Sequence, residues 1–230
     1  MIDFHSHFLP AIDDGSRSPA QSEQMLRSSF AQGVEVIAAT PHFYAWHMDP
    51  KQFLSRRQRA LESICYDEGT MPQILLGAEV AYYDSMQFSE ELGLFCIGKS
   101  RLLLVEMPFT VWTERMVKNI ASLPVNQGVT PVLAHIERYL HYGKNKKWLP
   151  FLQEQGVLIQ SNCEFFLSRL RGRHAVKLLQ QGVIQFLGTD CHNMEDRQPN
   201  MEQTIRKIVA MGGRKRLAEV EATAKKLLCL

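Results

Sequence analysis

The sequence predicts an α/β fold in which parallel strands close, or nearly close, into a ring. Short apolar runs alternate with helical patterns along the chain, an order typical of parallel strands joined by right-handed crossovers. Most of the runs are apolar throughout, as expected for strands covered on both faces. Histidines and acids recur at the ends of nearly all of these runs, from the first to the seventh. An open doubly wound sheet would hold its edge strands far apart, so this spread favours a ring.

Seven strands are expected, and residues 1–230 are expected to form a single domain because no repeat or linker-like stretch interrupts the pattern. The predicted strands are Ile2–Ser6, Val34–Thr40, Gln73–Val80, Arg101–Met107, Thr130–His135, Val157–Asn162 and Val183–Thr189.

The helical patterns between these runs have recognisable ends. Ser18-Pro19-Ala20-Gln21 offers an N-cap, a proline at the first helical position and a capping-box glutamine, and Gly33 ends that helix. Asp49-Pro50 opens a second helix that runs toward Gly69. A third pattern, over residues 84–92, precedes the fourth strand. Three glycines stand where a C-terminal helix cap belongs, just before a strand: Gly128, Gly156 and Gly182.

The tail after Asn200 predicts two helices broken at Gly212-Gly213. Its basic residues are expected on a solvated helix face, with contact to a membrane surface or a kinase as the alternative. These residues are Arg214, Lys215, Arg216, Lys225 and Lys226.

The composition is that of an ordinary globular protein, with 45% hydrophobic and 22% charged residues. A net charge of +2 provides no broad basic field, so nucleic acid is not an expected partner. The five cysteines are scattered without a CxxC pair, which fits a reducing cytoplasm. The N-terminus lacks the features of a signal peptide, and no apolar run reaches membrane-spanning length. We therefore expect a cytoplasmic protein without membrane insertion.

Metal ligands stand at nearly every predicted strand end, which is where active sites lie in βα folds. The first strand ends in His5-Ser6-His7, and residues two apart on a strand face the same side, so both imidazoles can bind one ion. Glu79 and Glu106 follow apolar runs, where an ionised acid is costly to bury unless it is paired or metal-bound. A lone strand-end histidine is usually structural, but five of the eight histidines share this rim. The sequence therefore predicts a multinuclear metal site, with these further candidates: His42, His135, Asp190 and His192.

Six ordered motifs extend from Met1 to about Arg197. They are His5-x-His7, Asp13-Asp14-Gly15, Thr40-Pro41-His42, Gly77-Ala78-Glu79, His135-Ile136-Glu137-Arg138-Tyr139 and Gly188-Thr189-Asp190-Cys191-His192. Together they resemble the polymerase-and-histidinol-phosphatase (PHP) superfamily, and within it the bacterial protein-tyrosine phosphatases of capsular and exopolysaccharide operons. The resemblance implies a distorted (β/α)7 TIM-like barrel with a metal site at the C-terminal ends of the strands.

The same resemblance implies three divalent metal ions, usually manganese, although a mixed nitrogen and oxygen ligand set also admits iron or zinc. It places His5, His7, Glu79 and Asp190 on the first ion, with Glu79 bridging to a second held by Glu106 and His135. Asp14, His42 and His192 would hold the third. Three divalent ions and four carboxylates leave a charge of about +2, which suits a phosphate dianion.

Arg138 and Arg197 match the two active-site arginines of the family and would clamp the phosphoryl oxygens. The implied reaction is hydrolysis of phosphotyrosine by metal-bound hydroxide, without a phosphoenzyme. The implied substrate is a phosphotyrosine protein, in the first place a bacterial tyrosine kinase of polysaccharide export. Phe43-Tyr44-Ala45-Trp46 and Trp112 could flank the substrate ring, with loop packing as the alternative.

Two rival functions remain at this point: a PHP phosphatase of a small metabolite such as histidinol phosphate, and a non-catalytic, metal-stabilised interaction domain. A homo-oligomer is also left open.

Two further motif matches are rejected. Gly93–Ser100 matches the P-loop pattern, but a helical pattern precedes it and a strand follows, the reverse of the required order. Cys191 and Arg197 have the Cys-x5-Arg spacing of thiol phosphatases, but Glu195 and Asp196 between them would repel a phosphate.

Overall fold

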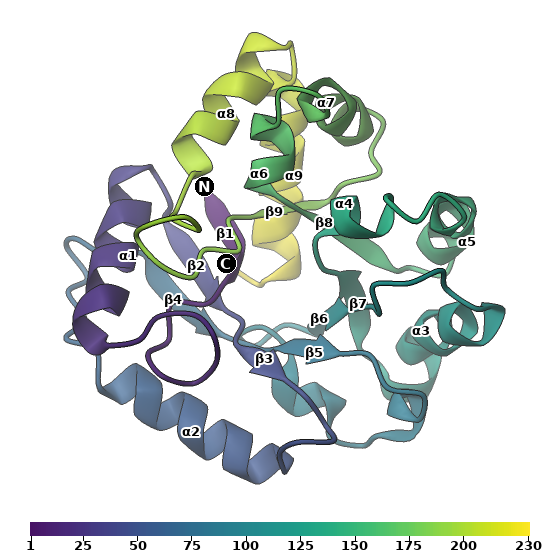
Figure 1. The fold of residues 1–230 in the computed structure, drawn as a ribbon, viewed down its shortest axis with the longest axis horizontal. Helices are drawn as coiled ribbons and strands as arrows, with labels where there is room; N and C mark the ends of the chain where they lie inside the picture. The colour runs from purple at the N-terminus through teal and green to yellow at the C-terminus, as the bar shows by residue number, and fades with distance from the viewer.

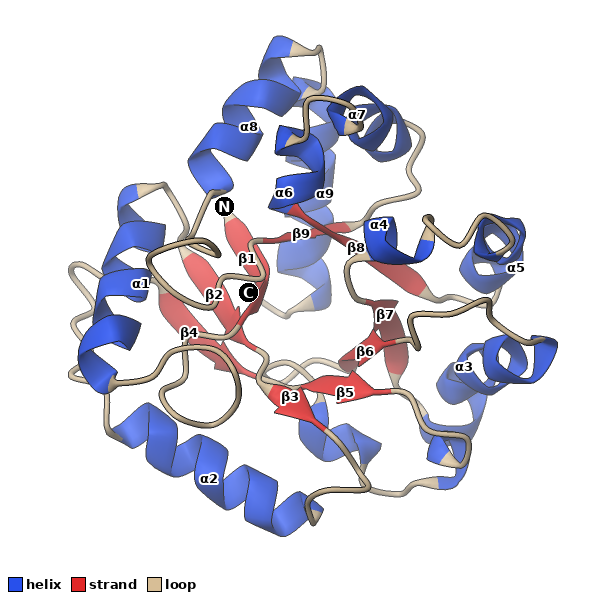
Figure 2. Ribbon diagram, in the orientation of Figure 1, coloured by secondary structure: helices blue, strands red, loops and turns tan.

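The strands form a parallel ring surrounded by helices (Figures 1 and 2). The computed structural model describes residues 1–230. One sheet has the order β1-β2-β4 and the other has the order β3-β5-β6-β7-β8-β9, and every pairing is parallel. The strands are β1 (Ile2–Ser6), β2 (Val36–Ala39), β3 (His42–Phe43), β4 (Gln73–Leu76), β5 (Glu79–Ala81), β6 (Leu102–Glu106), β7 (Thr130–Leu133), β8 (Leu158–Asn162) and β9 (Phe186–Gly188).

The two sheets belong to one ring of seven strand positions. β2 continues into β3 and β4 into β5, because Gly77 N–H donates to Ala39 O (2.9 Å) and Glu79 N–H donates to Pro41 O (3.0 Å) across the breaks. At the other join, Asp190 N–H donates to His5 O at 2.7 Å, beside the isolated parallel bridge between Ser6 and Cys191. The prediction of a distorted barrel with seven strand positions is thus confirmed.

Helices cover the outside of this ring (Figure 2). They are α1 (Pro19–Ala31), α2 (Pro50–Glu62), α3 (Glu114–Gln127), α4 (Ile136–Tyr139), α5 (Leu149–Glu154), α6 (Cys163–Leu167), α7 (Gly172–Gln180), α8 (Met201–Ala210) and α9 (Arg214–Leu227). The short 3-10 segments are η1 (Met86–Phe88), η2 (Leu92–Phe95) and η3 (Asn145–Trp148). No helix of the structure has the length and apolar character needed to cross a membrane.

Several helix ends follow the predicted capping chemistry. The Ser18 side chain accepts the N–H of Gln21 at the start of α1, and Asp49 accepts the N–H groups of Lys51 and Gln52 at the start of α2. Gly128 ends α3 in the left-handed region with φ 61°, a conformation that glycine adopts without steric cost.

Three element predictions differ from the structure. The helical pattern over residues 84–92 forms only the short segments η1 and η2, and α2 ends at Glu62 rather than near Gly69. The predicted strand Gln73–Val80 breaks at Gly77, where a Cβ would lie 2.7 Å from the Ile97 side chain. That close approach depends on tertiary packing and has no local signal.

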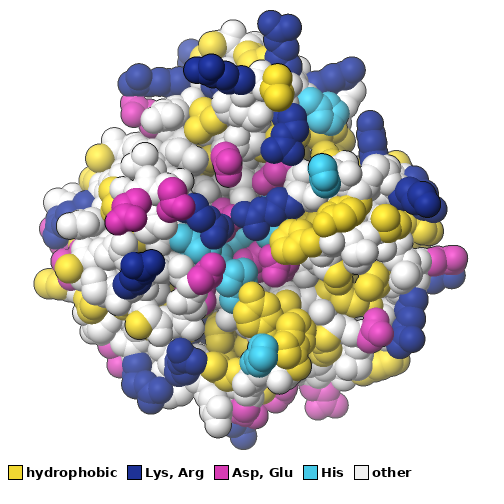
Figure 3. All heavy atoms as spheres, viewed as in Figure 1, with side chains coloured by type: hydrophobic (Ala, Val, Ile, Leu, Met, Phe, Trp, Pro, Cys, Tyr) yellow, Lys and Arg dark blue, Asp and Glu magenta, His cyan; other side chains and the backbone are white.

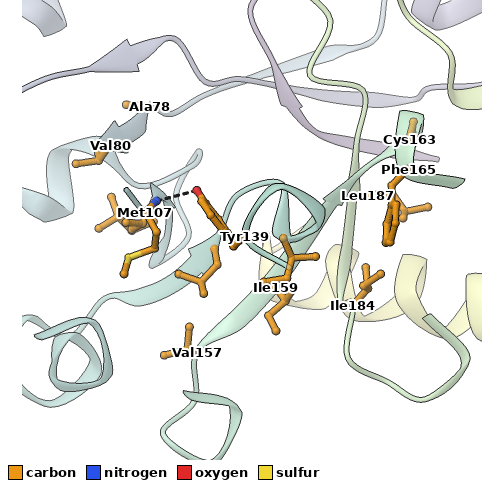
Figure 4. Packing of buried hydrophobic residues seen from close by; sticks show 14 of the residues in the cluster. Ala78, Val80, Met107, Tyr139, Val157, Ile159, Cys163, Phe165, Ile184 and Leu187 are labelled. Carbon is orange, nitrogen blue, oxygen red and sulfur yellow. Dashed lines mark hydrogen bonds between the residues drawn. The ribbon is translucent and has the colours of Figure 1, made fainter. Parts of the chain in front are cut away.

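The hydrophobic core has two layers. The outer layer lies between the strands and the helices, and in it Tyr139 packs among Val80, Met107 and Ile159 (Figure 4). The phenol oxygen of Tyr139 accepts the backbone N–H of Met107 at 2.8 Å, so this buried hydroxyl group is not left without a partner.

The inner layer fills the lower part of the ring with side chains such as Phe4 and Leu104. Ala224 and Leu228 of the C-terminal segment join this layer, and Lys225 of α9 contacts Glu35 just before β2, so α9 lies at the amino ends of the strands. The opposite, carboxyl end of the ring is left for polar side chains.

Candidate metal centre

The imidazoles of His5 and His7 meet at the carboxyl end of β1. Both residues are fully buried, and their Nε2 atoms lie 3.0 Å apart. The expectation that the two rings face the same side is therefore confirmed. Figure 3 shows histidine and acidic side chains gathered in a hollow at the centre of this face, with basic side chains beside them.

Glu79, the first residue of β5, lies at the centre of the cluster. Its Oε2 lies 3.1 Å from His5 Nε2 and 3.3 Å from His7 Nε2, while its Oε1 lies 2.9 Å from His135 Nε2. Glu106 at the end of β6 approaches the same His135 nitrogen at 3.2 Å. One buried carboxylate thus joins the two groups of residues expected at the first and second ions.

Asp14, His42 and His192 lie on the outer side of the cluster. Asp14 Oδ1 is 3.6 Å from His42 Nε2 and 3.5 Å from His192 Nε2. The predicted groups overlap in space, because His42 Nδ1 also lies 3.1 Å from Glu79 Oε2 and His7 stacks on His192 with ring centroids 4.0 Å apart. The structure brings all nine predicted ligands together, and their division among ions remains a prediction.

The donor atoms are spaced as ligands of metal ions would be. The 3.0 Å between the Nε2 atoms of His5 and His7 is the separation that two ligands about 2.1 Å from one ion subtend at a right angle. His192 Nε2 is buried without a hydrogen-bond partner. The residues fall into three groups whose donor atoms lie within 4.8 Å of one another: His7, Asp14, His42 and His192; His5, His7 and Asp190; His42, Glu79 and Glu106.

The ionisable side chains of the cluster hold opposite charges together. Burial by itself would raise the pKa of Glu79, but the neighbouring imidazoles of His5 and His135 keep it well below its usual range. Burial would likewise lower the pKa of His135, but the carboxylates of Glu106 and Glu79 raise it to about 9. In the metal-free protein the cluster therefore contains ionised acids and protonated histidine.

Backbone strain occurs at two of the predicted ligands. His135 has φ 31° and Asp190 has φ 53°, values that side-chain-bearing residues rarely adopt. Such strain persists where surrounding contacts impose it, and it concentrates at functional sites.

Arg138 of α4 and Arg197, in the loop after β9, converge on one oxygen atom. Their Nη2 atoms lie 2.7 and 2.8 Å from Asp190 Oδ2. Each guanidinium group has five N–H donors, so this contact leaves others free. Both arginines are about one-third exposed, which leaves them accessible at the rim of the hollow.

Residues that hold the ligands in place were not predicted. Asp13 Oδ2 lies 2.7 Å from His7 Nδ1 and also accepts the N–H of His42, and Gln160 and Asn162 contact further ligands from β8. Asp13 stands beside a predicted ligand in its motif. Gln160 and Asn162 are two apart at the end of the one predicted strand that lacked a ligand, which was the available signal.

The aromatic residues divide between the two alternatives left open by the sequence, core or loop packing and contact with a substrate ring. Trp112 is 3% exposed and packs on Tyr139, and Phe43 is buried against Phe95, so neither can touch a substrate ring. Tyr44 stacks on His42, and Trp46 next to it is 59% exposed. The sequence interpretation missed Phe109, which is 47% exposed and stacks on His135.

The structure supports rejecting the two competing motifs. Cys191 is fully buried, and burial raises the pKa of its thiol far above the range of a reactive thiolate. Gly93–Ser100 includes the end of η2 and leads into β6, so no helix N-terminus faces a phosphate there.

Comparison with known proteins identifies the family of this chain. The sequence-family model "Capsular polysaccharide synthesis, CpsB/CapC" matches residues 1–228. This chain belongs to the CpsB/CapC family. It is 29% identical to tyrosine-protein phosphatase CpsB of Streptococcus pneumoniae over 96% of this chain and 94% of that protein. It is 27% identical to tyrosine-protein phosphatase YwqE of Bacillus subtilis over 89% of this chain and 82% of that protein.

A solved structure shares the fold. It comes from work on YwqE from Bacillus subtilis and CpsB from Streptococcus pneumoniae, described as unique metal-dependent tyrosine phosphatases. The TM-score is 0.82 at 24% identity, covering 99% of this chain and 94% of that chain.

Proposed function

We propose that this chain is a metal-dependent protein-tyrosine phosphatase of capsular or exopolysaccharide synthesis. The observation that carries the proposal is the convergence of five histidines and four acids beneath two arginines at one end of the barrel. The family membership and the tyrosine-protein phosphatase relatives support the same reaction.

We assign the nine converging residues as ligands of three divalent ions, with manganese as the first choice. When bound, such ions supply Lewis-acid stabilisation of charge and a water of lowered pKa. The ligands are His5, His7, Asp14, His42, Glu79, Glu106, His135, Asp190 and His192.

Arg138 and Arg197 bind the phosphoryl group in this proposal. Their shared contact with Asp190 Oδ2 holds both guanidinium groups at the rim of the cluster before substrate arrives. Charge-assisted N–H donors placed where negative charge develops stabilise a phosphoryl-transfer transition state. No thiol takes part, since Cys191 is buried.

An aryl leaving group suits the surface around the cluster. Phe109 presents an exposed apolar ring stacked on His135, and Tyr44 stacks on His42. A phenol with a pKa near ~10 also leaves more readily than an aliphatic alcohol. A tyrosine on a flexible chain segment can reach this open hollow, so we infer that the substrate is a phosphotyrosine protein, in the first place a polysaccharide-export tyrosine kinase.

The test compares hydrolysis of a phosphotyrosine peptide and of histidinol phosphate by the metal-supplemented protein. We expect a higher kcat/KM for the peptide, and faster hydrolysis of the metabolite would overturn the substrate assignment. His7→Ala should abolish turnover while circular dichroism remains that of a folded protein. Wild-type protein that binds metal but hydrolyses no phosphoester would instead support an interaction domain.

A further inference from the structure

We propose that Gln160 and Asn162 of β8 form an amide relay that selects which atom of His5 and of Asp190 faces the metals. The two residues are buried at the end of the strand that contributes no ligand of its own. The proposal rests on the assigned metal ligands, and it adds positioning residues to them.

A backbone N–H, which can only donate, fixes the direction of every hydrogen bond in the relay. The backbone N–H of His135 lies 2.6 Å from Gln160 Oε1, so this oxygen accepts and the Gln160 amide cannot be flipped. Gln160 Nε2 then donates to Asn162 Oδ1 at 3.0 Å. Asn162 consequently turns its own NH2 group toward Asp190.

At His5 the relay selects a tautomer. His5 Nδ1 lies 3.3 Å from Gln160 Oε1, an atom that can only accept, so Nδ1 carries the proton. The lone pair of the imidazole is then on Nε2, which faces His7 Nε2 and Glu79 Oε2. Hydrogen bonds from the non-ligating nitrogen are the usual way in which proteins set the tautomer of a metal-binding histidine.

At Asp190 the relay gives the two carboxylate oxygens different roles. Asn162 Nδ2 donates to Oδ2 at 2.8 Å, the oxygen that also accepts from both arginines. Oδ1 stays free and lies 3.6 Å from His5 Nε2 and 3.5 Å from His7 Nε2. When Arg138 and Arg197 turn to a phosphoryl group, Asn162 is the donor that still holds Oδ2.

The neighbouring strand leaves space for the relay. Gly188 of β9 lies beside it, and a Cβ there would come within 2.5 Å of His5 Cβ and 2.7 Å of Gln160 Nε2. A side chain at this position would displace either the ligand or the glutamine that orients it.

The first experiment measures metal binding rather than turnover. Gln160→Met keeps the length of the side chain and removes its acceptor, so titration of the metal-free protein with Mn²⁺ should show roughly 10- to 100-fold weaker binding. Gln185→Met is the matched control, because Gln185 Oε1 also accepts a backbone N–H, that of Ile159 at 2.9 Å, but Gln185 lies just before the amino end of β9, away from the predicted ligands at the carboxyl ends of the strands. This control should bind Mn²⁺ as wild type does.

The second experiment observes the tautomer directly. Nitrogen-15 NMR of the zinc-loaded wild-type protein should show the His5 proton on Nδ1. Gln160→Glu retains an acceptor for the Nδ1 proton of His5 and should keep it protected from exchange with solvent, whereas Gln160→Met removes that acceptor and should lose the protection. The wild-type spectrum remains decisive even if the methionine variant fails to fold.

A His5 proton on Nε2 in the wild-type protein would overturn the relay. So would Mn²⁺ binding by Gln160→Met equal to that of wild type, or equal weakening in Gln185→Met. Absence of Mn²⁺ binding by the wild-type protein is a separate outcome, because it would overturn the proposed function itself.

Discussion

Replacing Phe109 with alanine should reduce the preference of the enzyme for aryl phosphates. The Phe109 ring is 47% exposed, and it stacks on His135 with centroids 5.7 Å apart. An aromatic side chain has about 200 Å² of surface, so nearly half of it, ~95 Å², is available to a substrate ring. If stacking covers about half of that area, the burial contributes ~1.2 kcal/mol.

The aromatic pairing itself adds about 0.5–1.5 kcal/mol. The total of ~2 kcal/mol corresponds to a loss of ~30-fold in kcat/KM for a phosphotyrosine peptide. The assay measures kcat/KM for this peptide and for the matched phosphoserine peptide, under the same metal supplementation. Phe109→Ala should lower the first value and leave the second nearly unchanged. The prediction is therefore a fall in the ratio of the two kcat/KM values.

Phe30→Ala is the matched control, because Phe30 has a similar exposure of 41% but lies on α1, outside the metal cluster. It should alter neither substrate. An equal fall for both peptides in Phe109→Ala would show that Phe109 acts by supporting His135, and an unchanged ratio would refute the proposed stacking.

Three further predictions concern the metals and the buried acids. Chelation with EDTA should abolish activity and added Mn²⁺ should restore it, whereas iodoacetamide should leave kcat unchanged, because the Cys191 thiol is buried and its pKa is raised. Asp13→Asn should weaken Mn²⁺ binding by roughly 10- to 100-fold in calorimetric titration. The carboxylate accepts from His7 Nδ1 and from the backbone N–H groups of Gly15 and His42, and a single amide oxygen cannot accept from all three. Wild-type affinity in this variant would contradict the role of Asp13. Burial raises the pKa of Asp3 to about 6, above its value in the unfolded chain, so in metal-free protein its contribution to stability is greatest below about pH 4 and is lost as the pH rises through 6. In urea titrations, the free energy of unfolding of the wild-type protein should therefore fall by about 3 kcal/mol as the pH rises through this range, and that of Asp3→Asn should not. Identical pH profiles for the two proteins would contradict the shift.

Much of the fold was predictable because its signals are local. Continuous apolar runs indicate buried parallel strands, and capping residues such as Ser18 and Asp49 mark helix starts by hydrogen bonds within a few residues. The prediction of a helix over residues 84–92 was wrong because the local helical pattern competes with packing of this segment against α3, where Asn119 Nδ2 donates to Asp84 O. That contact spans 35 residues and leaves no trace in the local pattern.

The sequence by itself determined the candidate ligands and the order in which they follow the strands. Parallel strands place their carboxyl ends at one edge, so His5, Glu79 and Asp190 could be expected to meet. It did not determine which atoms face one another, since a residue pattern does not specify rotamers or tautomers. Only the tertiary structure placed Trp112 in the core, Phe109 at the rim and Gln160 between two ligands. Those positions depend on the closure of the ring, which brings together side chains from strands far apart in the chain.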